Sequence, residues 1–190
     1  MAATIPTNGM GLDAGLDITG GNLTFKTADK GVNLGVTSGA ASNLLHDYEE
    51  GTWTISIGNH DASEAMTLNG TYGGTSGTFY YNKIGSHVTV IGYVVATGNG
   101  TVDSGSEGLY INGLPFTVKN STTTYSAVSI AYAQGLNITA SEHISAYTRL
   151  NETHAALQRW DATSGSTALT RDEFSSDGGF IFTINYLTDA

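Results

Sequence analysis

The side chains most able to do chemistry in this chain are its histidines and its clustered carboxylates. The histidines do not stand at HExxH or other metal-ligand spacing; they are His46, His60, His87, His143 and His154. Cysteine is absent, which excludes thiolate ligands and disulfides. The spacing therefore predicts ordinary strand or loop positions for the histidines, with no metal site and no cofactor.

Two acidic stretches could in principle supply a carboxylate pair or calcium ligands. The denser one holds Asp47, Glu49 and Glu50, and the other runs from Arg171 to Asp177. Calcium loops need several oxygen ligands at defined spacings, and neither stretch has such a pattern. We expect the first stretch to be a solvated loop before a strand at Trp53, and the second to be a turn leading into the last strand.

Signatures of nucleophilic catalysis and of phosphate binding are also missing. The chain has no Gly-x-Ser-x-Gly elbow, and no helix is expected after Gly73-Gly74 or after 98–100, as a phosphate-binding loop would require. We therefore assign no catalytic and no cofactor-binding residue. The sequence predicts that the protein is not an enzyme.

The elements that carry these residues are predicted to be strands. Apolar residues alternate with polar or small ones at 53–57, 128–132 and 180–186, which places one face of each strand in a core. The stretch 87–95 is apolar on both faces, which is typical of a central strand covered on both sides. Frequent Asn-Gly and Gly-Gly turns separate these runs. We predict an all-β fold, an antiparallel β-sandwich that is jelly-roll-like.

The chain divides into an extended N-terminal arm, residues 1–45, and a β-sandwich domain, residues 46–190. The arm is rich in glycine and has only short apolar islands, too few to offset the entropy of ordering it alone. We expect contact with another chain to order the arm, and we expect residues 1 to about 40 to be the docking element. Its predicted apolar anchors are Ile5, Met10, Leu12 and Leu16.

Charge and hydropathy exclude several partners. Among 190 residues, 17 are acidic and 7 basic, a formal net charge of -10. Such a surface repels phosphate backbones and anionic lipid, so we predict no nucleic-acid and no membrane partner. The first residues carry neither a basic nor an apolar leader segment, and the sequence has no long apolar run. We expect synthesis in the cytoplasm of a host cell.

One stretch resembles a known family. Residues 44–54 read LLHDYEEGTWT, close to the LLDDYEEGTWTP signature of bacteriophage tail-fibre and other virion proteins, many from marine and cyanobacterial phages. The segments YNKIGSHVTV at 81–90, LYINGLPFT at 109–117 and FIFTINY at 180–186 resemble the later segments of that family, and the resemblance covers most of residues 22–190 in order. His46 stands where the family commonly has Asp, and Ile55 where it commonly has Pro.

This resemblance implies a virion location and a homotrimer. With no heptads, collagen-like run or internal repeat in the sequence, we predict a trimeric capsid decoration (cement) protein on the capsid exterior, bound to the major capsid protein of the phage and stabilising the shell. The alternative is a small tail-fibre or spike module that binds a host surface glycan. A polysaccharide-degrading tailspike ranks last.

Aromatic residues bear on the choice between these functions. Trp53 alternates with threonines and is predicted to lie in the core. Tyr72, Tyr80, Tyr81 and Trp160 could stack on sugar rings, or could line a subunit interface, where aromatic residues are enriched. We favour core or interface positions for them.

Overall fold

The computed structural model describes residues 32–33, 44–45, 47–72, 78–105, 107–161 and 165–189. The chain divides into two compact units, Met1–Leu44 and Leu45–Ala190. A two-stranded sheet joins β1 (Val32–Asn33) to β2 (Leu44–Leu45). The four predicted anchors of the arm lie outside the described residues, so its docking role stays a prediction.

Eleven strands of the unit Leu45–Ala190 form one antiparallel sheet, in which nine follow the order β3-β6-β7-β13-β9-β10-β11-β8-β4, while β12 pairs with β11 and β5 with β7. The strands are β3 (Tyr48–Trp53), β4 (Ser56–Gly58), β5 (Thr67–Leu68), β6 (Phe79–Ile84), β7 (His87–Gly98), β8 (Tyr110–Asn112), β9 (Ala127–Gln134), β10 (His143–Thr148), β11 (His154–Asp161), β12 (Gly165–Ala168) and β13 (Gly179–Leu187).

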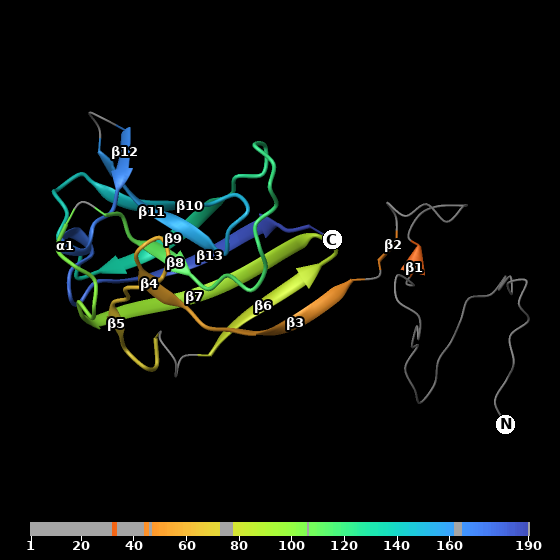
Figure 1. Ribbon diagram of the computed structural model, residues 1–190, viewed down its shortest axis with the longest axis horizontal. Coiled ribbons are helices and arrows are strands. Elements are labelled where there is room, and N and C mark those ends of the chain that lie inside the picture. The colour runs from red at the N-terminus through yellow and green to blue at the C-terminus, as the bar shows by residue number, and fades with distance from the viewer. Residues whose placement is uncertain are drawn as a thin grey trace, which may run out of the picture. The chain divides into compact units, whose positions relative to one another are not determined.

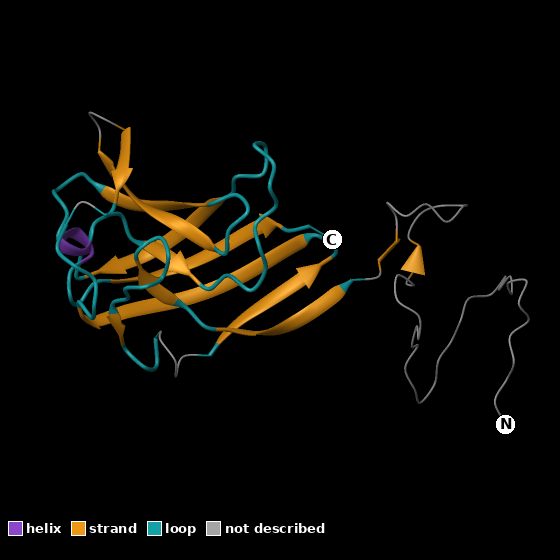
Figure 2. Cartoon of the chain, in the orientation of Figure 1, coloured by secondary structure: helices purple, strands orange, loops and turns teal. Residues whose placement is uncertain are grey.

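The sheet curls over into two facing layers. Strands β3 and β4 stand at opposite ends of the strand order, yet only Thr54 and Ile55 separate them in the sequence. Figure 1 shows β3, β6, β7 and β13 in one layer and β10 and β11 in the other. The prediction of an all-β, antiparallel fold is confirmed, as Figure 2 makes plain. The strand order does not establish the more specific jelly-roll-like connectivity.

The core is built by strict alternation along the two longest strands. On β7 the inward positions are buried: Val88, Val90, Gly92, Val94 and Ala96. On β13 the buried positions are Phe180, Phe182, Ile184 and Tyr186. A Cβ at Gly92 would lie 2.5 Å from the ring of Phe182, its partner on the neighbouring strand β13, so this glycine leaves room for that ring in the core. Since β7 lies between β6 and β13, its predicted central place in the sheet is confirmed.

The predicted alternation fails at one strand. Along β9, Val128 is buried and Ile130 is half-buried, but Tyr132 is exposed. The pairing with β13 shifts between Phe180 and Phe182, because an extra residue of β9 bulges out of the ladder. Such a bulge reverses the side-chain direction beyond it. Tyr132 therefore lies on the outer face, where its ring is 6.3 Å from that of Tyr93.

The second acidic stretch is a turn before the last strand, as predicted, and this turn is helical. Arg171–Phe174 forms a single helical turn, α1, shortly before β13 begins at Gly179. It is fixed by a capping box, in which Glu173 accepts a hydrogen bond from the backbone N–H of Thr170. Phe174 is fully buried, so the carboxylates here position a core residue. Among the described residues, no helix is long and apolar enough to cross a membrane.

Candidate functional site

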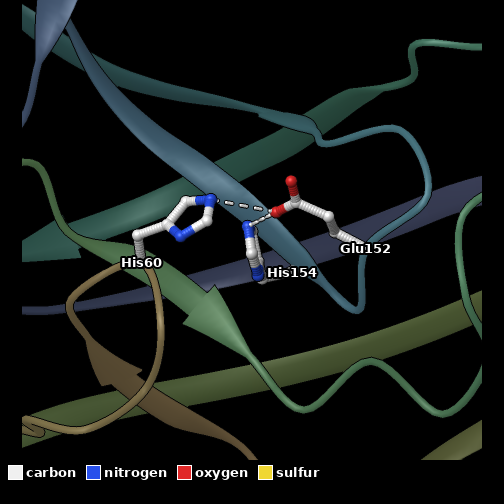
Figure 3. Close-up of side chains that lie close together, drawn as sticks. All are labelled: His60, Glu152 and His154. Atoms are coloured by element: carbon white, nitrogen blue, oxygen red, sulfur yellow. Dashed lines mark ion pairs between the residues drawn. The ribbon is translucent and has the colours of Figure 1, made fainter.

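Two histidines and one glutamate from distant parts of the sequence converge near one end of β8 and β11. Figure 3 shows a ring nitrogen of His60 and one of His154 facing the same carboxylate oxygen of Glu152. The Nε2 of His60 lies 3.1 Å from Oε2 of Glu152, and the Nε2 of His154 forms an ion pair with that same oxygen. The two imidazole rings lie 4.7 Å apart. The potential ligand atoms of all three lie within 4.8 Å of one another.

His60 is positioned by a loop after β4 that is held by hydrogen bonds. The backbone carbonyl of Asn59 accepts a hydrogen bond of 3.1 Å from the buried side chain of Asn112 on β8. The side-chain oxygen of Asn59 accepts from the backbone N–H of Glu64, and Asp61 accepts from that of Ser63. These bonds hold the loop at both sides of His60.

The other two residues are positioned by the hairpin between β10 and β11. The backbone carbonyl of Glu152 accepts from the N–H of Val118, and that of Thr153 accepts from Gly113 and Leu114. His154 opens β11 and is paired with Asn112 of β8. The same strand β8 therefore anchors both the loop of His60 and the hairpin of Glu152 and His154.

One histidine of the cluster is buried and the other is exposed. His154 is only 8% exposed, whereas His60 is exposed. Oε2 of Glu152 and Nε2 of His154 are buried without a partner of hydrogen-bonding geometry among the described residues. Burial lowers the pKa of His154 below its ordinary value, with His60 and Arg149 acting in the same direction and Glu152 opposing them. The lowered pKa favours the neutral form of the His154 imidazole over the protonated one.

This cluster could not be found from spacing. His60 and Glu152 are far apart in the sequence, and only the pairing of β4 and β11 with β8 brings them together. A weak signal was available in Glu152-x-His154, since alternate strand residues share a face. Of the other histidines, His87 begins β7, His143 stacks on Trp160 at 5.8 Å, and His46 lies outside the described residues.

The first acidic stretch forms a second polar cluster around Lys83. It is not a solvated loop, because Tyr48–Trp53 is strand β3. The Nζ of Lys83, a residue only 5% exposed, forms an ion pair with Asp47 and a second one of 3.5 Å with Glu49. Burial alone would lower the pKa of Lys83, but the hydrogen bond and charge of Asp47, joined by Glu49, raise it. Glu50 points to the outside, where Tyr48 donates to it.

The phage-like signature therefore has a structural explanation within this fold. Asp47 and Glu49 compensate the charge of Lys83, which is contributed by the YNKIG segment paired with β3. A Cβ at Gly51 would lie 2.8 Å from the ring of Tyr81, so any larger residue there requires this ring to move. Trp53 is buried and packs edge-on against Phe79 and Phe182.

The outer face of the layer β3-β6-β7-β13-β9 is apolar and open. We define this outer face by six residues, Tyr72, Tyr80, Ile91, Tyr93, Tyr132 and Ile181. Tyr80 is 61% exposed, Ile91 51% and Ile181 42%. Two shallow hollows share Tyr80 and Ile91 in their linings. The prediction that 87–95 is covered on both sides is thus fulfilled by the described residues on the inner side only.

The aromatic residues singled out from the sequence fall into separate places. Tyr72 and Tyr80 belong to the outer face, where Tyr72 packs on Tyr93 at 4.8 Å. Tyr81 is half-buried and meets Phe116 edge-on at 5.3 Å. Trp160 lies on β11, away from this layer. The structure therefore brings together two of the four, and adds Tyr93 and Tyr132.

Comparison with known proteins finds one similar fold and no similar sequence family. No family model matches the chain, and no curated protein matches it. Among solved structures, the crystal structure of the Dettilon tailspike protein is similar with a TM-score of 0.57 and 21% sequence identity. The likeness covers 73% of this chain and 23% of the tailspike chain. This chain therefore shares its all-β fold with part of a tailspike protein.

Proposed function

We propose that this chain is a non-enzymatic structural module of a bacteriophage virion. The observation that carries the proposal is the fold shared with a tailspike protein over 73% of the chain. The resemblance of residues 44–54 to a signature of phage virion proteins supports it independently. The ion pairs of Lys83 and the capping box that precedes Phe174 support a structural role, because they fix β3 and a buried core residue.

Within the virion, we place the module in the tail. Of the two locations left open by the sequence, the tailspike fold favours a fibre or spike over the capsid exterior. Capsid decoration, with the arm bound to the major capsid protein, remains the alternative. Mass spectrometry of purified virions distinguishes them: a few copies to a few dozen are expected for a tail module. A copy number in the hundreds would overturn the tail assignment and favour the shell.

The module acts by association with copies of itself into a homotrimer. The outer face is apolar and aromatic in a chain of net charge -10, and Glu50 is the charged residue in the linings of its two hollows. Tyrosine and isoleucine faces without charge are typical of the cores of subunit interfaces. The same face in a monomer would expose an apolar patch that soluble monomers seldom keep.

A pair of variants tests this role of the outer face. Ile91→Asp inserts a charge into the centre of the proposed interface, and should convert the trimer to a folded monomer in light scattering. Tyr125→Asp is the matched control, because Tyr125 is 53% exposed but lies beside Tyr147 of β10. The wild-type protein at the mass of a single chain, or a trimer that survives Ile91→Asp, would contradict the proposal.

A further inference from the structure

We infer that His60, Glu152 and His154 form a binding site for a divalent transition-metal ion of the zinc class, against the expectation from sequence spacing. The ligand atoms are Nε2 of both histidines and Oε2 of the glutamate. This inference does not depend on where the protein lies in the virion.

The geometry of the three atoms is close to that of a coordination sphere. Zinc binds imidazole nitrogen and carboxylate oxygen at about 2.0 to 2.2 Å, so two ligand atoms of a tetrahedral site lie about 3.3 Å apart. The Nε2 of His60 and Oε2 of Glu152 are 3.1 Å apart, and the potential ligand atoms of all three residues lie within 4.8 Å. Nε2 of His154 and Oε2 of Glu152 are in direct contact, so their side chains must rotate apart for one ion to lie between the three atoms.

The burial of the cluster calls for a partner. His154 is more than nine-tenths buried, and its Nε2 has no hydrogen-bond partner among the described residues. The buried Oε2 of Glu152 is in the same state. Buried polar atoms are normally satisfied. These two atoms contact each other as an ion pair without hydrogen-bond geometry, and a cation bound to both would ligate each of them together with Nε2 of His60.

The backbone holds the ligands in place before any metal arrives. The loop 59–64 is closed by hydrogen bonds from Glu64 and Ser63, and Asn112 donates to its first residue. The hairpin that carries Glu152 is bound to Val118 and Leu114. Binding therefore costs little ordering of the chain, unlike a site that forms only as the protein folds.

The donor set selects the class of ion. Two imidazoles with one carboxylate suit Zn²⁺, Co²⁺, Ni²⁺ or Fe²⁺, whereas Ca²⁺ and Mg²⁺ prefer oxygen ligands throughout. Three protein ligands leave at least one coordination position free. The side chain of His60 is 53% exposed, so that position is reachable by water.

Titration with Co²⁺ and Zn²⁺ tests the site directly. The full chain, produced without a polyhistidine tag, is stripped with a chelator that is then removed. Co²⁺ should produce a saturable visible absorption at one ion per chain, and Zn²⁺ should displace it. Zn²⁺ at a hundredfold excess over its Kd should raise the melting temperature by about 5 °C or more. Failure to observe saturable binding, or an unchanged melting temperature, would overturn the site and leave an ion pair only.

Variants locate the ion within the molecule. His60→Ala removes an exposed ligand without opening the core, and should weaken Co²⁺ binding at least about tenfold. His154→Ala should abolish the spectrum, and Glu152→Gln should weaken it while keeping the side-chain shape. His143→Ala is the matched control, because His143 is an exposed histidine stacked on Trp160. If His143→Ala weakens binding as much as His60→Ala, the ion sits elsewhere; if neither changes it, the assignment is equally wrong.

Discussion

The clusters around Lys83 and around His154 place a buried nitrogen beside carboxylates in two different ways. The ammonium of Lys83 faces both Asp47 and Glu49, and the ring of Phe116 lies 5.4 Å from its Nζ. The imidazole of His154 shares a single carboxylate oxygen with a second histidine. The first cluster is closed, since every buried charge has a partner. The second cluster is open, since its buried nitrogen and oxygen contact each other without hydrogen-bond geometry and its other histidine is exposed.

The difference shows how the two groups are tolerated in the interior. A lysine keeps its charge near neutral pH unless burial is extreme, so it must be compensated by carboxylates. A histidine can be neutral at the same pH and then becomes an acceptor. The charges of the lysine cluster therefore compensate one another, whereas a neutral imidazole in the histidine cluster can act as a ligand for the proposed cation.

The largest effect is expected when both carboxylates of the closed cluster are neutralised. Asp47→Asn together with Glu49→Gln leaves the Lys83 charge buried with no counter-charge. We expect the free energy of unfolding to fall by about 3 to 5 kcal/mol, measured by chemical denaturation. Adding Lys83→Met to the double variant should restore much of the loss. A loss below about 1 kcal/mol would mean that Lys83 reaches water and that the cluster is not closed.

A smaller effect is expected from the glycine that seats β3 against β6. Gly51→Ala places a Cβ at 2.8 Å from the Tyr81 ring, which must turn aside or push the strand away. Overpacking of this kind costs about 1 to 3 kcal/mol. Gly85→Ala is not a suitable control because of its positive φ, whereas Gly105, with nothing within 4 Å of an added Cβ and no such φ, is suitable. Equal stabilities for the Gly51 and Gly105 variants would remove the explanation given for this glycine.

The same two clusters show how far the sequence reaches. Alternation at 53–57 and 180–186 was enough to predict buried faces, because a two-residue period is a local property of a strand. The bulge that turns Tyr132 outward is set by pairing with β13, and no local pattern predicts it. The partners of Lys83 and of His154 come from other strands, so their roles depend on register. Spacing therefore predicted a solvated loop where partly exposed carboxylates pair with a buried lysine, and unrelated histidines where a cluster exists.

In the open cluster, loss of the carboxylate should cost little when no metal is present. Glu152→Gln removes the charge beside His154, but a neutral imidazole leaves no uncompensated charge behind. We expect a decrease of about 1 kcal/mol in metal-free protein, the scale of one hydrogen bond. The measurement is denaturant unfolding with a chelator present. A loss as large as that of the double variant at Asp47 and Glu49 would show that His154 is charged and that the two clusters are alike.

The smallest effect is expected at an ion pair of the same chemistry on the surface. Lys119 and Asp189 lie 3.1 Å apart, with side chains 42% and 76% exposed. Because water interacts with each charge about as favourably as the charges interact with each other, such pairs contribute about 0 to 1 kcal/mol to the free energy of unfolding. Asp189→Asn should therefore change the free energy of unfolding by less than about 0.5 kcal/mol, and added salt should remove even that. The variant calibrates the closed cluster: Lys83 and Lys119 differ in burial, while both face carboxylates. If Asp189→Asn costs as much as the loss of Asp47 and Glu49, burial is not the reason for the strength of the first pair, and the distinction between the clusters would need another cause.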